Sequence, residues 1–252
     1  MMNDRITTLR LITLLTMTCL SSTAVSEQKE LLIENVSNLP IHASESSIAR
    51  ANIVAIIGGK GMKNPSGASK NYLITQKEYF ISQGINYYIF PNRSTEEKAT
   101  YELRASSGRL EKIHNLVKEI SKRNSLPIYL VGFSRGSVDA THFAKKYPNS
   151  IEGIILMSGV YKRGVFSVQK IAQKVLETNV LVVHHKQDNC KVTPYKKAND
   201  FTKSLQAKTK KIVTIDGGLS TGRECGPLNH HGFEGVEKEA ADAVTSWIIN
   251  TQ

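Results

Sequence analysis

The chain has 252 residues, a length that suits one well-buried α/β domain. Its formal net charge is +11 at pH 7, but the lysines and arginines are spread along the chain rather than gathered in one arm with interleaved aromatic residues. This pattern argues against a nucleic-acid partner and indicates a solvated basic surface.

Residues 1–26 have the features of a secretory signal peptide. Arg5 and Arg10 lie before a short apolar run that begins at Leu11, and small residues end the segment at Ser26. The run is too short for a transmembrane helix, so we predict cleavage after Ser26, export to the periplasm or the medium, and no stable membrane insertion afterwards. An uncleaved anchor is one alternative. A lipoprotein acylated at Cys19 is another, but the residues before Cys19 lack a small-residue lipobox pattern.

The remaining residues, 27–252, are predicted to form one domain in which strands and helices alternate. Several of the strands are continuous apolar runs, which are typical of a parallel sheet buried on both faces. The pattern predicts an α/β fold with a mainly parallel sheet and helices on both faces. Strands are predicted at residues 30–36, 52–57, 85–90, 128–131, 151–157, 180–184 and 211–215, helices at 71–83, 101–123, 138–146, 168–176 and 237–249, and a connection at 38–49.

A glycine-rich turn, residues 58–61, follows the second predicted strand and is called the glycine loop below. Phosphate binding would call for the lysine and following serine or threonine of a P-loop, and that arrangement is absent. The other function of such a turn is to offer free backbone N–H groups to an oxyanion. Gly59 and Lys60 are the candidate donors, Lys60 through its backbone rather than its ammonium group.

Residues 132–136, Gly-Phe-Ser-Arg-Gly, match the G-x-S-x-G nucleophile elbow. The two glycines let the chain turn sharply from strand to helix and leave room around the serine. An apolar strand precedes the motif and a helical pattern follows it, as an elbow requires. An ordinary glycine-rich turn of an α/β protein is the alternative. We predict Ser134 as the nucleophile and the Arg135 N–H as a second oxyanion donor.

Asp188 and His231 are predicted to complete a catalytic triad with Ser134. Asp188 follows the strand at 180–184 and His231 follows the last strand, and catalytic groups of such sheets gather at the carboxyl ends of the strands. Serine needs a base to take its proton, imidazole has a suitable pKa, and a carboxylate fixes the imidazole tautomer. His230 is the alternative base. His231 is preferred because it directly precedes Gly232.

Other ionisable residues near these motifs fit the triad less well. Asp139 lies inside the helix after the elbow. Asp216 is too close in sequence to the loop of His231 for the usual spacing of acid and histidine in such enzymes. His184 and His185 are neighbours on a strand and point to opposite faces, so they are poorly placed to share a metal ion with Asp188. No metal and no cofactor are expected.

Cys190 and Cys225 are the cysteines that remain once residues 1–26 are removed. In an exported chain two cysteines are expected to pair, and they are too few to form a metal site by themselves. We therefore predict a disulfide, which would stabilise the fold by about 4 kcal/mol in the chain-entropy account. It would join the loops of Asp188 and His231.

Taken together, four motifs resemble the α/β-hydrolase superfamily, and within it a group of small secreted bacterial serine hydrolases of the esterase and lipase type. The resemblance covers nearly all of the exported chain and implies the fold, the triad, an oxyanion hole and ester hydrolysis through an acyl-enzyme. Relatives often insert a cap domain where this chain has only residues 158–179, so little or no cap is expected. Gly-Gly-Lys-Gly replaces the His-Gly-Gly-Gly of many lipases, so the resemblance does not decide whether Gly59 or Lys60 is the oxyanion donor. The motifs are residues 57–61, 132–137, 184–190 and 231–237, with Trp247 near the end.

The expected function is a secreted serine hydrolase that cleaves a small carboxylic ester or acyl substrate. A peptidase or amidase on the same fold is one alternative. The other is a non-catalytic protein whose basic surface binds anionic polymers. The oligomeric state and the acyl-chain length stay open.

Overall fold

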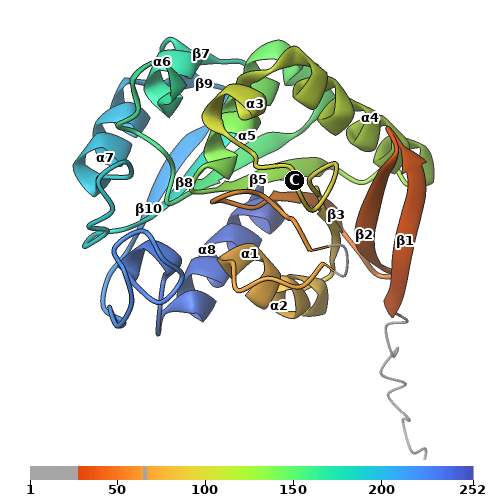
Figure 1. The fold of residues 1–252 in the computed structure, drawn as a ribbon, viewed down its shortest axis with the longest axis horizontal. Coiled ribbons are helices and arrows are strands. Elements are labelled where there is room, and N and C mark those ends of the chain that lie inside the picture. The colour runs from red at the N-terminus through yellow and green to blue at the C-terminus, as the bar shows by residue number, and fades with distance from the viewer. Residues whose placement is uncertain (1–27, 65–66, 252) are drawn as a thin grey trace, which may run out of the picture.

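The computed structural model describes residues 28–64 and 67–251. The predicted signal peptide and Cys19 lie outside this range. Within it, one sheet of eight strands forms the centre of the fold (Figure 1). Its strands are β1 (Gln28–Val36), β2 (Leu39–Ser46), β3 (Ala51–Ile56), β4 (Ile85–Ile89), β5 (Ile128–Phe133), β6 (Gly153–Met157), β8 (Asn179–His185) and β10 (Lys210–Ile215).

The strand order is β1-β2-β4-β3-β5-β6-β8-β10. The pairs β1–β2 and β2–β4 are antiparallel, and every other pair in this sheet is parallel. The carboxyl ends of β3, β5, β8 and β10 therefore lie at the same edge of the sheet, which is where the predicted site residues follow their strands. Two short strands, β7 (Val175–Leu176) and β9 (Gln206–Ala207), pair separately.

Helices cover both faces of the sheet, as predicted. On the face drawn above the sheet in Figure 1 are α3 (Tyr101–Ala105), α4 (Ser107–Arg123), α5 (Gly136–Lys146), α6 (Val168–Ala172) and α7 (Tyr195–Ser204). On the other face are α1 (Tyr72–Thr75), α2 (Lys77–Ser82) and α8 (Glu237–Asn250). Short 3₁₀ helices are η1 (Pro148–Ser150), η2 (Gly164–Phe166) and η3 (His230–Gly232).

Each buried strand contributes alternate side chains to two separate apolar cores. In β3, Val54 and Ile56 pack in the core beneath α4 and α5, whereas Ile53 and Ala55 pack in the core beneath α2 and α8. A strand buried on both faces is apolar at most positions, and the buried Asn52 of β3 is hydrogen-bonded to Asn86 and Asn124. Burial on both faces explains the continuous apolar runs in the sequence and confirms the predicted fold class.

The prediction of a connection at residues 38–49 was wrong, because β2 occupies most of it. Ser37 and Asn38 both have positive φ, 54° and 58°, and form a two-residue turn that pairs Val36 with Leu39. Asparagine tolerates this left-handed conformation, which fits a tight hairpin. β2 then places alternate residues in the core, starting with Leu39 and Ile41.

Three predicted helices are shorter than expected. The helix predicted at 71–83 is divided at Gln76 into α1 and α2. The helix predicted at 101–123 is divided at Ser106, whose extended backbone and hydroxyl cap the start of α4. The helix predicted at 168–176 ends after Ala172, because Gln173 has a left-handed backbone. Helix α7 was not predicted.

The segment between β6 and β8 contains only η2, α6 and β7. No cap domain is inserted there, in agreement with the sequence prediction. None of the helices in residues 28–64 and 67–251 has the length and apolar character of a membrane span.

Candidate active site

Ser134 lies on the turn between β5 and α5, with φ of 50°. The glycines on either side are required by close packing. A Cβ at Gly132 would lie 2.5 Å from the carbonyl oxygen of Gly136, and a Cβ at Gly136 would collide with the carbonyl oxygen of Ile56. Gly58 is similarly constrained, since its Cβ would lie 2.8 Å from that of Ser134. The sequence of the elbow therefore lets the serine approach the glycine loop closely.

The structure brings the three predicted triad residues together. Ser134 Oγ lies 3.1 Å from Nε2 of His231, and Nδ1 of His231 lies 3.0 Å from Oδ2 of Asp188. Their exposed fractions are 9%, 1% and 7%. Both distances are in the hydrogen-bonding range. A proton on Nδ1, donated to the carboxylate, leaves Nε2 free to accept the serine proton.

The structure also distinguishes the two adjacent histidines. His230 stacks its ring on His185, with centroids 4.3 Å apart, whereas His231 contacts the serine and the carboxylate. His231 is further held by Ser158, whose hydroxyl donates to its carbonyl oxygen at 2.8 Å, and its ring packs edge-on against Phe133. The geometry agrees with the choice of His231 over His230.

The carboxylate of Asp188 accepts several hydrogen bonds inside the protein. Cys190 N donates to Oδ1 at 2.9 Å and the Thr193 hydroxyl to Oδ2 at 2.8 Å, while His184 Nε2 lies 3.3 Å from Oδ2. Burial by itself would raise the pKa of Asp188, but the hydrogen bonds and charges of His184 and His231 outweigh it and hold the pKa well below its ordinary value. Asp188 is therefore a carboxylate at neutral pH.

Thr193 is a site residue that sequence reasoning missed. Its hydroxyl lies 3.2 Å from His231 Nδ1 as well as 2.8 Å from Asp188 Oδ2, so it contacts both partners of the acid–base pair. Its carbonyl oxygen also accepts from His184 Nε2 at 2.7 Å. The only signal in the sequence is that a threonine follows the acid by five residues.

The predicted disulfide between Cys190 and Cys225 is present. It joins the loop of Asp188 to the loop that leads into His231. Atoms of Asp188, Cys190 and His231 lie within 4.8 Å of one another, a spacing that could suit a metal ion. Because the Cys190 sulfur is bonded to Cys225, it offers no thiolate, and Asp188 and His231 are already hydrogen-bonded to each other.

The predicted oxyanion donors lie beside Ser134. Gly59 and Lys60 are in the glycine loop after β3, and Arg135 follows the serine directly. Within residues 28–64 and 67–251, no hydrogen bond uses the backbone N–H of any of these three residues. They line or adjoin a cavity of about 260 Å³, the serine cavity, which also contacts Ser134 and His231. Free N–H groups beside a nucleophile are what an oxyanion hole requires.

A buried ion cluster supports the glycine loop from behind. The Arg104 guanidinium donates to the carbonyl oxygens of Ile57 at 3.0 Å and Gly59 at 3.4 Å, and pairs with Asp139. Asp139 also pairs with Arg109. Arg104 and Asp139 have no exposed side-chain surface. The alternative acid Asp139 thus forms ion pairs with two arginines and does not contact His231.

The other alternative acid, Asp216, is exposed and pairs with Lys186 at 3.0 Å, so it too is separate from the triad. Three exposed cations, Lys60, Lys70 and Arg223, line the serine cavity, and no Asp or Glu of the described chain is among its lining residues. None of the three forms an ion pair within the described ranges. The entrance to the cavity is therefore positively charged.

Comparison with known proteins agrees with this architecture. The sequence model of the Phospholipase/Carboxylesterase family matches residues 89–218, which include the elbow and the Asp188 loop. No curated protein matches the chain in sequence.

Three solved structures have the same fold and little sequence identity to the chain. A dienelactone hydrolase from Anabaena variabilis ATCC 29413 is similar with a TM-score of 0.65 and 15% identity, over 88% of this chain and 98% of the other. Est1E from Butyrivibrio proteoclasticus has a TM-score of 0.62 and 16% identity, over 88% and 98%. A soluble variant of monoglyceride lipase from Saccharomyces cerevisiae has a TM-score of 0.62 and 13% identity, over 92% and 96%. At such identities these likenesses show the fold.

Proposed function

The chain belongs to the Phospholipase/Carboxylesterase family and has the α/β-hydrolase fold, and from this premise we propose that it hydrolyses carboxylic esters through an acyl-enzyme on Ser134. The observation that carries the proposal is the unbroken contact from Ser134 through His231 to an ionised Asp188, with distances of 3.1 and 3.0 Å. An isolated serine hydroxyl is a weak nucleophile at neutral pH, and this contact supplies its base.

In the proposed reaction the Ser134 oxygen attacks the ester carbonyl carbon while His231 Nε2 takes the hydroxyl proton. The negative charge that develops on the carbonyl oxygen is held by the N–H groups of Arg135 and of Gly59 or Lys60. His231 then gives its proton to the leaving alcohol. A water molecule then attacks the acyl-enzyme while His231 takes its proton. His231 returns this proton to the Ser134 oxygen as the carboxylic acid leaves.

The serine cavity supports a small substrate with a negative charge. Its volume of about 260 Å³ suits a short acyl group, and no cap domain is inserted between β6 and β8. Lys60, Lys70 and Arg223 would attract an anionic group on the acyl or alcohol side, while a cationic ester would be repelled. Esters that carry a carboxylate are therefore proposed as better substrates than neutral esters of equal length.

The alternatives have less support. A peptidase that recognises a free amino terminus needs an acidic group beside the nucleophile, and the described lining of the serine cavity contains none. A binding protein would have no use for three loops that place a serine, a histidine and a carboxylate in contact. Export remains a proposal based on residues 1–26, and the Cys190–Cys225 disulfide is compatible with it.

The proposal is tested by labelling the protein with a fluorophosphonate probe. Wild type and a Ser125→Ala control, which removes an exposed serine, should be labelled, and Ser134→Ala should not. A series of p-nitrophenyl esters would then rank acyl-chain length. A folded wild type that takes no label would disprove the activated serine.

The preference for charge is tested with two esters of equal chain length, p-nitrophenyl glutarate, which carries a free carboxylate, and p-nitrophenyl pentanoate. Arg223→Gln should lower kcat/KM for the anionic ester about three- to fivefold at low salt and leave the neutral ester unchanged. Lys208→Gln removes an exposed charge that does not line the serine cavity and is the matched control. Equal effects on both esters would rule out recognition of charge.

A further inference from the structure

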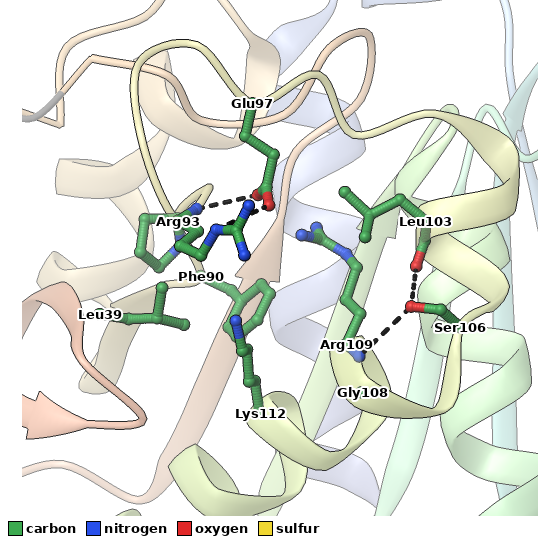
Figure 2. A pocket seen from close by; sticks show the side chains of 10 residues that line it. Leu39, Phe90, Arg93, Glu97, Leu103, Ser106, Gly108, Arg109 and Lys112 are labelled. Atoms are coloured by element: carbon green, nitrogen blue, oxygen red, sulfur yellow. Dashed lines mark hydrogen bonds and ion pairs between the residues drawn. The ribbon is translucent and has the colours of Figure 1, made fainter.

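A second cavity, of about 210 Å³, shares no lining residue with the serine cavity. It lies between the start of β2, the end of β4, the loop that follows β4, and the first turns of α4 (Figure 2). Its lining residues are Leu39, Phe90, Pro91, Arg93, Glu97, Leu103, Ser106, Gly108, Arg109 and Lys112.

Arg109 is the most deeply buried charge in this cavity, with only 5% of its side chain exposed. Its Nε donates to Asp139, and its guanidinium carbon lies 4.9 Å from the centre of the Phe90 ring. Neither of its terminal Nη groups has a hydrogen-bond partner within residues 28–64 and 67–251. Figure 2 shows the guanidinium extending into the space between Arg93 and Leu103. Arg109 therefore presents unused donors to the cavity.

The charge of the buried ion cluster is not balanced. Arg104 and Arg109 share one carboxylate, that of Asp139, so the cluster carries one formal positive charge in excess. Arg104 uses its remaining donors on backbone carbonyl oxygens, whereas Arg109 faces the cavity. An uncompensated buried charge is unfavourable, and an anion beside Arg109 would offset it.

The walls of the second cavity have both cationic and apolar parts. Arg93 and Lys112 add two further positive charges, and the single acid, Glu97, is paired with Arg93 at 3.7 Å. Leu39, Phe90, Pro91 and Leu103 form the apolar part. A ligand that suits these walls has an anionic head and a short apolar tail.

We propose that the second cavity binds a short-chain monocarboxylate and that its binding orders the glycine loop. The planar fork of Arg109 matches the two oxygens of a carboxylate, with Lys112 and Arg93 adding charge. A cavity of about 150 Å³ accommodates benzene, so this one has room for a straight acid of about six carbon atoms such as hexanoate. The tail would lie on Leu39 and Leu103.

The cavity is connected to the glycine loop by two sets of contacts. Arg109 pairs with Asp139, Asp139 with Arg104, and Arg104 binds the carbonyl oxygens of Ile57 and Gly59. In addition, the loop that carries Arg93 and Glu97 is bonded to the glycine loop: the Asn92 side chain donates to the carbonyl oxygen of Lys60 at 2.8 Å and to that of Glu97 at 2.9 Å.

A carboxylate that pulls Arg109 and Arg93 together would therefore tighten both sets of contacts behind the candidate oxyanion donors. Acids of this class are also released when short acyl esters are hydrolysed. An effect on turnover would rest on the proposed function, whereas binding and ordering would not.

Binding is tested by an amide NMR titration of the intact protein with hexanoate. Hexanoate should bind, and hexanamide, its neutral analogue, should bind at least about tenfold more weakly. Lys112→Gln and Arg93→Gln should each weaken hexanoate about three- to fivefold. Lys118→Gln, on the same helix but outside the cavity, should leave it unchanged. These partly or fully exposed sites avoid the folding risk of changing Arg109.

Ordering is tested by hydrogen exchange at the amides of residues 58–61. Saturating hexanoate should slow their exchange in wild type and in Lys118→Gln, and less so in Lys112→Gln at the same concentration. The proposal of a carboxylate site in the second cavity would be overturned if hexanamide bound as tightly as hexanoate. It would also be overturned if Lys112→Gln left hexanoate binding unaffected. Inorganic phosphate binding as tightly would overturn its assignment to a carboxylate with an apolar tail. Unchanged exchange in the saturated wild type would overturn the link to the glycine loop.

Discussion

Replacement of Asp139 by asparagine removes the anion that Arg104 and Arg109 share. The change keeps the shape of the side chain, so it leaves two buried guanidiniums without a counter-charge but creates no cavity. Breaking a buried ion pair by removing one partner costs about 3–5 kcal/mol. Domains are stable by about 5–15 kcal/mol, so the variant should still fold at room temperature with a much reduced margin.

The assay is thermal unfolding followed by circular dichroism. For a domain of this size a loss of 1 kcal/mol lowers Tm by about 2–4 °C, so Asp139→Asn should lower it by about 6–20 °C. Asp216→Asn is the matched control, because its carboxylate is exposed and pairs with the exposed Lys186, and it should change Tm little. A Tm for Asp139→Asn within about 2 °C of wild type would refute the assignment of this charge cluster as a structural support.

Three further predictions concern the loops of the site. Thr193→Val keeps the side-chain shape but removes the hydroxyl bonded to Asp188, so kcat for an ester should fall about tenfold or more in steady-state assays. Reduction of the Cys190–Cys225 disulfide should lower the free energy of unfolding by about 3–4 kcal/mol in urea titrations. The pKa of Asp188 is lower in the folded state than in the unfolded chain, where it is about 4. Its stabilising contribution is therefore complete above that pH and is lost as the pH falls below it, so the difference in unfolding free energy between wild type and Asp188→Asn should shrink in acid.

Each of these predictions has its own control. Thr193→Ser retains a hydroxyl and should keep most of the activity, so an equal loss in both variants would contradict a role for the hydrogen bond. Urea titrations of a double alanine variant of the two cysteines, with and without reductant, separate loss of the disulfide from other effects of the reductant. A stability difference between wild type and Asp188→Asn that is constant down to about pH 2 would show that the carboxylate pKa is not depressed.

The three residues of the proposed triad could be picked out from sequence because each belongs to a short local pattern. Ser134 is flanked by glycines that the turn requires, and Asp188 and His231 each follow a strand that is apolar enough to be recognised. In a parallel sheet the ends of such strands meet at one edge, so chain order alone brings the loops together. The distances that place His231 rather than His230 at the serine needed the structure.

The support behind the site could not be predicted. Arg109 precedes Leu110 on an amphipathic helix and is buried with it, a position that helical periodicity would assign to an apolar side chain. Asp139 has the sequence context of a helical surface acid, yet it has no exposed surface, because two arginines from α3 and α4 converge on it. Such contacts depend on how the helices pack against one another, and this packing cannot be predicted from a local sequence pattern. Strand β2 was missed for a different reason, since its alternation of buried residues is short and contains Pro40.

Three residues around the proposed nucleophile have a strained backbone. Ser134, Ser158 and Phe233 all have left-handed backbones, with φ of 50°, 44° and 61°, and each of them contacts His231 or lies beside it. This conformation costs a residue other than glycine about 1–2 kcal/mol. Glycine would relieve the backbone at each position, but it would delete the Ser134 hydroxyl, the Ser158 hydroxyl that holds His231, or the buried Phe233 ring. An engineer seeking a heat-resistant form of this protein should leave these three positions unchanged and look for stability in the surface loops.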